Sequence, residues 1–166
     1  MSVSASPAEP LPWAGRADHH CFGCSPVNPS GLALAFERTG DRLGTAFVLD
    51  HRYESYPGVV HGGILGLICD ETMGNLVVLR LGFPALTTSM RMRYLGVVTV
   101  GHRYRCVASA ATGATGPIAA RAEVLDEHDA VMATATASYQ PHQQAQQAQQ
   151  AQQAQQAQQA QQAMGA

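Results

Sequence analysis

The strongest constraint on the fold of this chain is a segment at residues 62–79 that is apolar on nearly every side. Its length and composition predict a helix, and a helix that is hydrophobic all round must be buried. No apolar run in the chain approaches the roughly 20 residues that a membrane span requires. We therefore expect this helix to be enclosed by the rest of the protein.

Alternating apolar and polar residues predict strands on both sides of this helix. Two precede it, at residues 32–37 and 44–49, and Thr39-Gly40 lies in the short link between them, which is typical of a hairpin. Four follow it, at residues 85–98, 102–111, 117–125 and 131–139. The economical arrangement is an α+β fold in which an antiparallel sheet wraps around one long central helix.

The chain divides into an arm, a domain and a tail. We expect residues 1–20 to form a flexible N-terminal arm, pinned to the body by Trp13, and residues 21–141 to form one domain. Residues 142–166 form a low-complexity tail that contains seven Gln-Gln-Ala repeats. The first residues lack the basic start and apolar stretch of a signal peptide, so we expect a soluble cytoplasmic protein with no membrane partner.

The net charge of −2 hides an uneven distribution. Residues 72–122 carry six arginines and no acidic residue, whereas the segments on either side are each acidic. One positive segment within a nearly neutral chain indicates a local anion site rather than a nucleic-acid surface. The arginines on the predicted strands at residues 85–98 and 102–111 are candidates for this site: Arg91, Arg93, Arg103 and Arg105.

A second cluster of reactive residues is Cys21-x-x-Cys24, which follows His19 and His20. These side chains could hold a metal, but zinc usually requires four ligands and the chain has no second Cys-x-x-Cys pair. A buried pair of reduced thiols is the simpler interpretation, so we assign no metal ligand and no cofactor. A small zinc or redox module remains the alternative.

The expected helix begins with His61-Gly62-Gly63. A helix N-terminus presents unpaired N–H groups and a partial positive charge. Glycines there allow a carbonyl to approach these groups, so the turn could stabilise negative charge that develops on a carbonyl oxygen. The alternative is that the glycines only permit tight packing of the turn.

Asp70 and Glu71 lie inside the apolar helix, where carboxylates are rare unless they are paired or functional. Gly63 and Asp70 are separated by about 10 Å along the helix axis, because each residue rises about 1.5 Å. One reacting carbon cannot contact both. If the two groups cooperate, they must come from different chains of a dimer, and the active site is then intersubunit.

The segment YPGVVHGGILGLICDE, together with CFGCSPVNPSGL upstream, resembles the hotdog-fold thioesterases of the PaaI type, within the 4-hydroxybenzoyl-CoA thioesterase-like superfamily. The likeness covers roughly residues 21–140. It implies a hotdog fold, an acyl-CoA substrate and a homodimer or homotetramer.

The resemblance also implies residue roles. Asp70 matches the catalytic carboxylate, acting from the opposite subunit as nucleophile or general base, with Glu71 as the second candidate acid. Gly62 matches the amide that polarises the thioester carbonyl. The other matched positions are His61, which arranges the turn, Thr87, which assists the water, and Ser55, where many members carry Asn or Gln. Coenzyme A would be bound by Gly63, Arg91, Arg93 and Arg103.

The sequence therefore predicts an acyl-CoA thioesterase that releases a free acid and CoA without a metal. A non-catalytic acyl-CoA-binding or regulatory domain is the alternative. A hydratase of the same fold is disfavoured, since such enzymes carry a His where this chain has Asn75.

Overall fold

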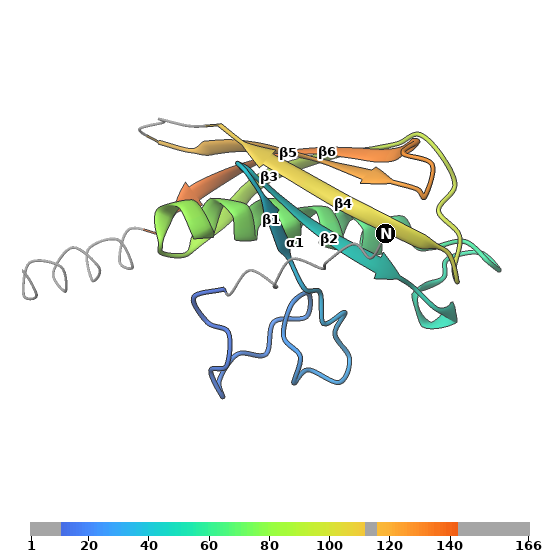
Figure 1. Cartoon of the computed structure of the whole chain (residues 1–166), viewed down its shortest axis with the longest axis horizontal. Coiled ribbons are helices and arrows are strands. Elements are labelled where there is room, and N and C mark those ends of the chain that lie inside the picture. Colours follow the sequence, from blue (N-terminus) through green and yellow to red (C-terminus); the bar gives the residue numbers. More distant parts are fainter. Residues whose placement is uncertain (1–10, 112–115, 143–166) are drawn as a thin grey trace, which may run out of the picture.

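The computed structural model describes residues 11–111 and 116–142. It contains one long helix and six strands (Figure 1). In chain order these are β1 (Glu37–Thr39), β2 (Arg42–Val48), the short 3-10 helix η1 (His51–Tyr53), α1 (Gly62–Leu81), β3 (Ala85–Tyr94), β4 (Arg103–Ala110), β5 (Ile118–Leu125) and β6 (Val131–Pro141).

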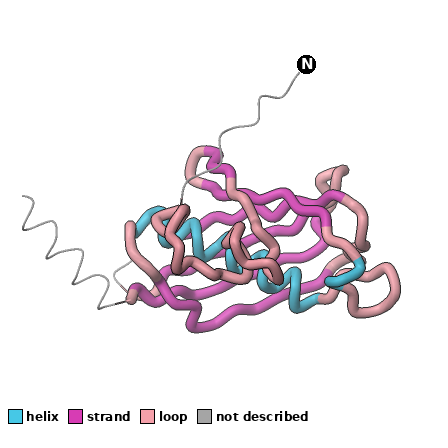
Figure 2. The backbone as a smooth tube through the Cα atoms, turned by 90° about the horizontal axis from the view of Figure 1, so that it is seen from below, coloured by secondary structure: helices cyan, strands magenta, loops and turns pink. Residues whose placement is uncertain are grey.

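The six strands form a single antiparallel sheet in the order β1-β2-β4-β5-β6-β3. Helix α1 crosses one face of this sheet and contacts the five strands β2 to β6 (Figure 1). On its other side the helix is covered by the loop segment before β1 (Figure 2). The expected α+β fold, a sheet wrapped around one buried helix, is confirmed.

The alternation of small and polar residues on β6 lets the helix lie close to the sheet. Ala133, Ala135 and Ala137 face α1 and are buried, and Tyr139 follows them in the same row. Small side chains under the helix leave little volume to fill, so the larger residues of α1 supply the core. Ile68, Met73 and Leu76 are among its fully buried side chains.

Two predicted strands are wrong in part, and one of them, expected at residues 85–98, ends at Tyr94. The strand expected at residues 32–37 begins only at Glu37. The preceding residues bond to the loop instead, since the N–H groups of Leu32 and Leu34 donate to the carbonyls of Phe22 and Gly23. Ala33 has a positive φ of 48°, which interrupts an extended run.

The packed structure includes residues before the boundary expected at residue 21. Residues 11–19 form successive turns, with backbone hydrogen bonds from Ala14 to Leu11 and from Arg16 to Trp13. Trp13 is half-buried and its ring lies 6.1 Å from that of His19, which belongs to the same N-terminal segment, so the pinning of this segment to the body stays a prediction. The Gln-Gln-Ala repeats and residues 1–10 lie outside the described residues.

Within the described part of the chain, no helix is both long enough and apolar enough to cross a membrane.

The helix glycines differ in what approaches them. A Cβ at Gly74 would lie 3.3 Å from the ring of Tyr139, whereas a Cβ at Gly66 would make an ordinary contact of 3.6 Å with Met90. The Tyr139 ring thus approaches the helix backbone closely at Gly74.

We predict that Gly66→Ala raises the stability of the fold and Gly74→Ala does not. Both changes gain up to about 1 kcal/mol of helix propensity, but the second must displace a buried tyrosine. Thermal or urea unfolding of the two variants gives the comparison. Equal stabilisation by both substitutions would contradict a tight contact between Tyr139 and the helix.

Candidate active site

The first turn of α1 leaves one backbone donor open. The N-cap residue is His61, whose Nδ1 accepts from the N–H of Gly63 at 2.9 Å. The N–H of Ile64 donates to the His61 carbonyl at 2.9 Å. Among the described residues the N–H of Gly62 has no acceptor. Gly62 is therefore available to a ligand, whereas the Gly63 amide supports the turn through His61.

Gly62 is also a site of close approach. The Tyr94 hydroxyl donates to the Gly62 carbonyl at 2.9 Å, and a Cβ at Gly62 would lie 3.1 Å from the Tyr94 ring. A glycine at this position thus lets β3 approach the start of the helix. Tyr94 was not anticipated from the sequence as a neighbour of this turn.

Asp70 lies on the same helix and is held by two hydroxyl donors from the sheet. Thr87 Oγ1 on β3 donates to Asp70 Oδ1 at 2.9 Å, and the Tyr139 hydroxyl on β6 donates to the same oxygen at 2.8 Å. No hydrogen bond to Oδ2 occurs among the described residues. One carboxylate oxygen is therefore fixed and the other can meet water or substrate.

Tyr139 is the site residue that sequence reasoning missed. Its side chain is 1% exposed, and burial, together with the neighbouring Asp70 carboxylate, raises the pKa of Tyr139 above its ordinary value. The phenol is thus a neutral donor at physiological pH. The sequence pattern could have indicated this residue. Tyr139 follows three inward-facing alanines at alternate positions of β6, so it also faces the helix.

Glu71 accepts hydrogen bonds from a different set of partners. Cys21 Sγ donates to Glu71 Oε1 at 3.0 Å, and Asn75 Nδ2 donates to Oε2 at 3.1 Å. Both of its oxygens are occupied, which separates its role from that of Asp70. The two acids nevertheless line one cavity of about 250 Å³, together with Trp13, Thr87 and Tyr139.

The other predicted residues lie apart from this cavity. Ser55 is exposed in the loop between η1 and α1, where its N–H donates to the Val59 carbonyl. The sequence placed the four candidate arginines on neighbouring strands, and this was wrong. β3 carries Arg91 and Arg93 and β4 carries Arg103 and Arg105, but β5 and β6 lie between these strands.

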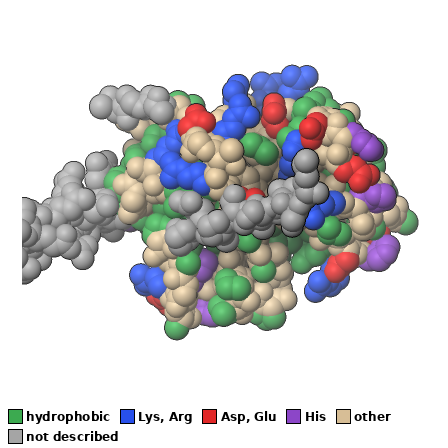
Figure 3. All heavy atoms as spheres, in the orientation of Figure 1, with side chains coloured by type: hydrophobic (Ala, Val, Ile, Leu, Met, Phe, Trp, Pro, Cys, Tyr) green, Lys and Arg blue, Asp and Glu red, His purple; other side chains and the backbone are tan. Residues whose placement is uncertain are grey.

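The strand order has a physical consequence for anion binding. Three strand spacings of about 4.8 Å separate β3 from β4, so the arginines of these two strands do not form one compact cluster. On β4 the two arginines alternate with buried residues, and on β3 they pair with Thr134 and Thr136, so all four belong to the sheet face away from α1. Several arginines lie over the sheet at the top of Figure 3. Arg105 also pairs with Asp129.

No protein-family model matches the sequence, and a search of curated proteins finds no match. Solved structures do match. A thioesterase superfamily protein aligns at a TM-score of 0.68 and 20% identity, over 82% of this chain and 72% of its own. A putative thioesterase of Ralstonia eutropha, related to phenylacetic acid degradation, aligns at 0.60 and 22% identity, over 66% of this chain and 85% of its own.

A Streptococcus mutans protein solved with acetyl-CoA aligns at a TM-score of 0.58 and 20% identity, over 64% of this chain and 88% of its own. These likenesses show that the chain has the hotdog fold found in proteins of the thioesterase superfamily. The expected fold is thereby confirmed.

The pKa of Tyr139 predicts a pH dependence of stability. In the unfolded chain the phenol ionises near pH 10, whereas in the folded protein it does so only at higher pH. Its contribution to stability is therefore full below about pH 10 and is lost as the pH rises toward the folded pKa. We expect Tyr139→Phe to lose stability less steeply than wild type between about pH 9 and about pH 11. Urea unfolding of both proteins across this range measures the difference, and parallel curves would contradict it.

Proposed function

We propose that the chain is an acyl-CoA thioester hydrolase that works as a homodimer. The observation that carries this proposal is the state of Asp70, a half-buried carboxylate with Oδ1 held by Thr87 and Tyr139 and Oδ2 open. A carboxylate fixed in this way is suited to act as a general base or as a nucleophile.

Hydrolysis through a general base follows from these groups. Asp70 Oδ2 takes a proton from water, and the water oxygen attacks the thioester carbon. The negative charge that develops on the carbonyl oxygen is stabilised by the Gly62 N–H and the positive end of the helix. The carbon–sulfur bond then breaks, and the leaving thiolate takes the proton. In the nucleophilic alternative, Asp70 attacks the carbon, the carbon–sulfur bond breaks and the CoA thiolate leaves. Water then hydrolyses the resulting anhydride, which releases the acid, restores the Asp70 carboxylate and supplies the proton that the thiolate takes.

The two groups cannot serve one thioester within a single subunit. Gly62 and Asp70 are eight residues apart on α1, which corresponds to about 12 Å along the axis. The site therefore combines Gly62 of one subunit with Asp70 of the other.

A surface suited to such a dimer lies along β3. This strand is at the edge of the sheet, so one side of its backbone is unpaired. Half of the exposed large apolar residues of the described chain lie on or just after it: Leu86, Met90, Tyr94, Leu95 and Val97. Pairing of β3 with the same strand of a second copy would satisfy the edge and cover these side chains.

The comparisons support the substrate class. Among proteins with this fold, the Streptococcus mutans protein was solved with acetyl-CoA and a Streptococcus pneumoniae hypothetical thioesterase with coenzyme A. In the proposed complex, Arg91 and Arg93 of one subunit or Arg103 of another would contact the CoA phosphates, because guanidinium groups bind phosphates bidentately.

The direct test is hydrolysis of a panel of acyl-CoAs by Asp70→Asn. We expect kcat to fall at least about 100-fold, because the amide cannot take the proton or attack the carbon. Free-thiol release measures turnover, with a blank without substrate to account for the protein's cysteines. Asp129→Asn, an exposed acid in the turn after β5, is the matched control.

Turnover by Asp70→Asn close to that of wild type would overturn the assignment. Binding of CoA without turnover by the wild-type protein on every substrate would instead indicate the non-catalytic acyl-CoA-binding domain.

The role of the Gly62 N–H can be separated from the effect of adding a side chain at this position. Proline lacks an N–H and is well tolerated at the first position of a helix, and His61 already has the extended backbone, with ψ of 129°, that precedes proline. We expect Gly62→Pro to lower kcat about tenfold or more below that of Gly62→Ala, since only alanine keeps the donor. Both variants displace the Tyr94 ring, so equal activities would exclude the amide as the carbonyl's donor.

A further inference from the structure

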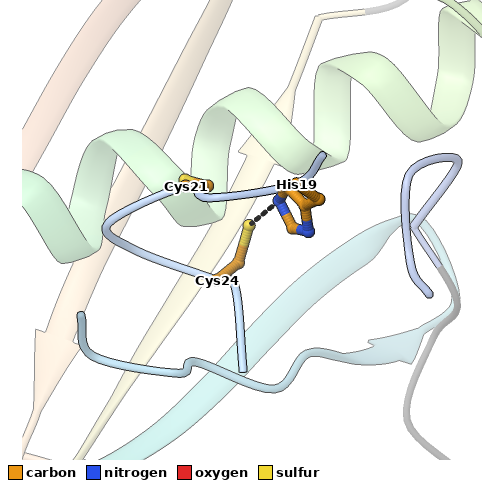
Figure 4. A group of neighbouring side chains, drawn as sticks. All are labelled: His19, Cys21 and Cys24. Atoms are coloured by element: carbon orange, nitrogen blue, oxygen red, sulfur yellow. Dashed lines mark hydrogen bonds between the residues drawn. The ribbon is translucent and has the colours of Figure 1, made fainter. Parts of the chain in front are cut away.

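We infer that this chain binds a zinc ion between its N-terminal loop and α1, through His19, Cys21 and Cys24 with Glu71 as the fourth ligand. Figure 4 shows the Cys24 thiol directed at the His19 ring, with Cys21 nearby on the same loop, and the ligand atoms of the three residues all lie within 4.8 Å of one another. Two thiols and one imidazole are ligands that zinc prefers. This site is separate from the proposed hydrolytic chemistry and replaces the expectation of no metal ligand.

One pair of ligand atoms has the spacing that a tetrahedral zinc ion requires. Zinc–sulfur and zinc–nitrogen bonds of about 2.3 and about 2.0 Å place the two ligand atoms about 3.5 Å apart at a tetrahedral angle. His19 Nε2 and Cys24 Sγ are 3.6 Å apart. The loop therefore holds this pair at the separation that a shared zinc ion requires.

Glu71 is a candidate for the fourth position, for which the sequence offered none. It is not among the three residues whose ligand atoms lie within 4.8 Å of one another, so its carboxylate would have to move toward the ion. Its Oε1 lies 3.0 Å from Cys21 Sγ, a separation that would widen by about half an ångström around a shared ion. The loop is shaped for this side chain, because a Cβ at Gly23 would lie 2.2 Å from Glu71 Cγ. Asn75 donates to Oε2 at 3.1 Å and so orients the carboxylate from behind, as outer-shell groups do in metal sites.

The cluster contains a carboxylate without a positively charged partner, because Glu71 lies beside the Cys21 thiol. In the described residues, no arginine or histidine forms an ion pair with Glu71. A divalent ion would supply the missing positive charge and stabilise both thiolates.

The position of the site gives it a structural role beside the proposed active site. His19, Cys21, Cys24 and Glu71 line the same cavity as Asp70. The ion would attach the loop that covers α1 to the helix at Glu71, the residue that follows Asp70. It would also occupy Glu71 and leave Asp70 as the carboxylate free to act on substrate.

Metal analysis of the protein, purified without a metal-binding tag and under reducing conditions, tests the inference. We expect about one zinc ion per chain, which falls below about a fifth in Cys24→Ser and His19→Ala. His20→Ala is the matched control, because His20 is the adjacent exposed histidine and its side chain is outside the cluster. Circular dichroism of each variant verifies that it is folded.

A second readout requires no substitution. Zinc is removed from the wild-type protein with a chelator, and cobalt(II) is added. We expect thiolate-to-cobalt charge-transfer absorption and the visible bands of a tetrahedral site, both saturating at about one cobalt per chain.

Folded protein that holds no zinc and gives no such cobalt spectrum would overturn the inference, as would zinc retained by both ligand variants or a Cys21–Cys24 disulfide under reducing conditions. Neither readout involves hydrolysis, so the inference stands or fails independently of the proposed function. Asp70→Asn should keep its zinc.

Discussion

The burial of α1 on all sides is the constraint on which the rest of the structure depends. A helix this apolar cannot face water, and the sheet covers one side of it while the loop before β1 covers the other. Enclosing the helix carries Asp70 and Glu71 away from bulk water. The protein must then satisfy both carboxylates, and it does so with different partners on the two sides of the helix.

The sheet side holds Asp70 and the loop side holds Glu71. Thr87 and Tyr139 donate hydroxyls to Asp70, whereas Glu71 meets Cys21 and Asn75. This division explains how two adjacent acids can have separate roles, one in chemistry and one in fastening the loop. Gly74 makes the first arrangement possible, because it lets the Tyr139 ring lie against the helix.

The helix and the strand order along the chain could be predicted because they depend on local periodicity. The sequence does not show which strands are neighbours in the sheet, so the arginines of β3 and β4 were wrongly expected to lie together. Tyr139 and Glu71 were underestimated for the same reason: their partners are distant in sequence, and only the closed fold brings them into contact. Residues 32–36 look like a strand by alternation, but their hydrogen bonds go to the loop.

The central claim is that one active site takes Gly62 and Asp70 from different subunits, and mixing of two inactive variants tests it most directly. Asp70→Asn and Gly62→Pro subunits are mixed and allowed to exchange, with hetero-dimer formation followed by native mass spectrometry. A mixed dimer has one intact site, so a fully exchanged equal mixture should recover about a quarter of wild-type activity. A mixture that forms hetero-dimers yet stays as inactive as its parents would contradict the account.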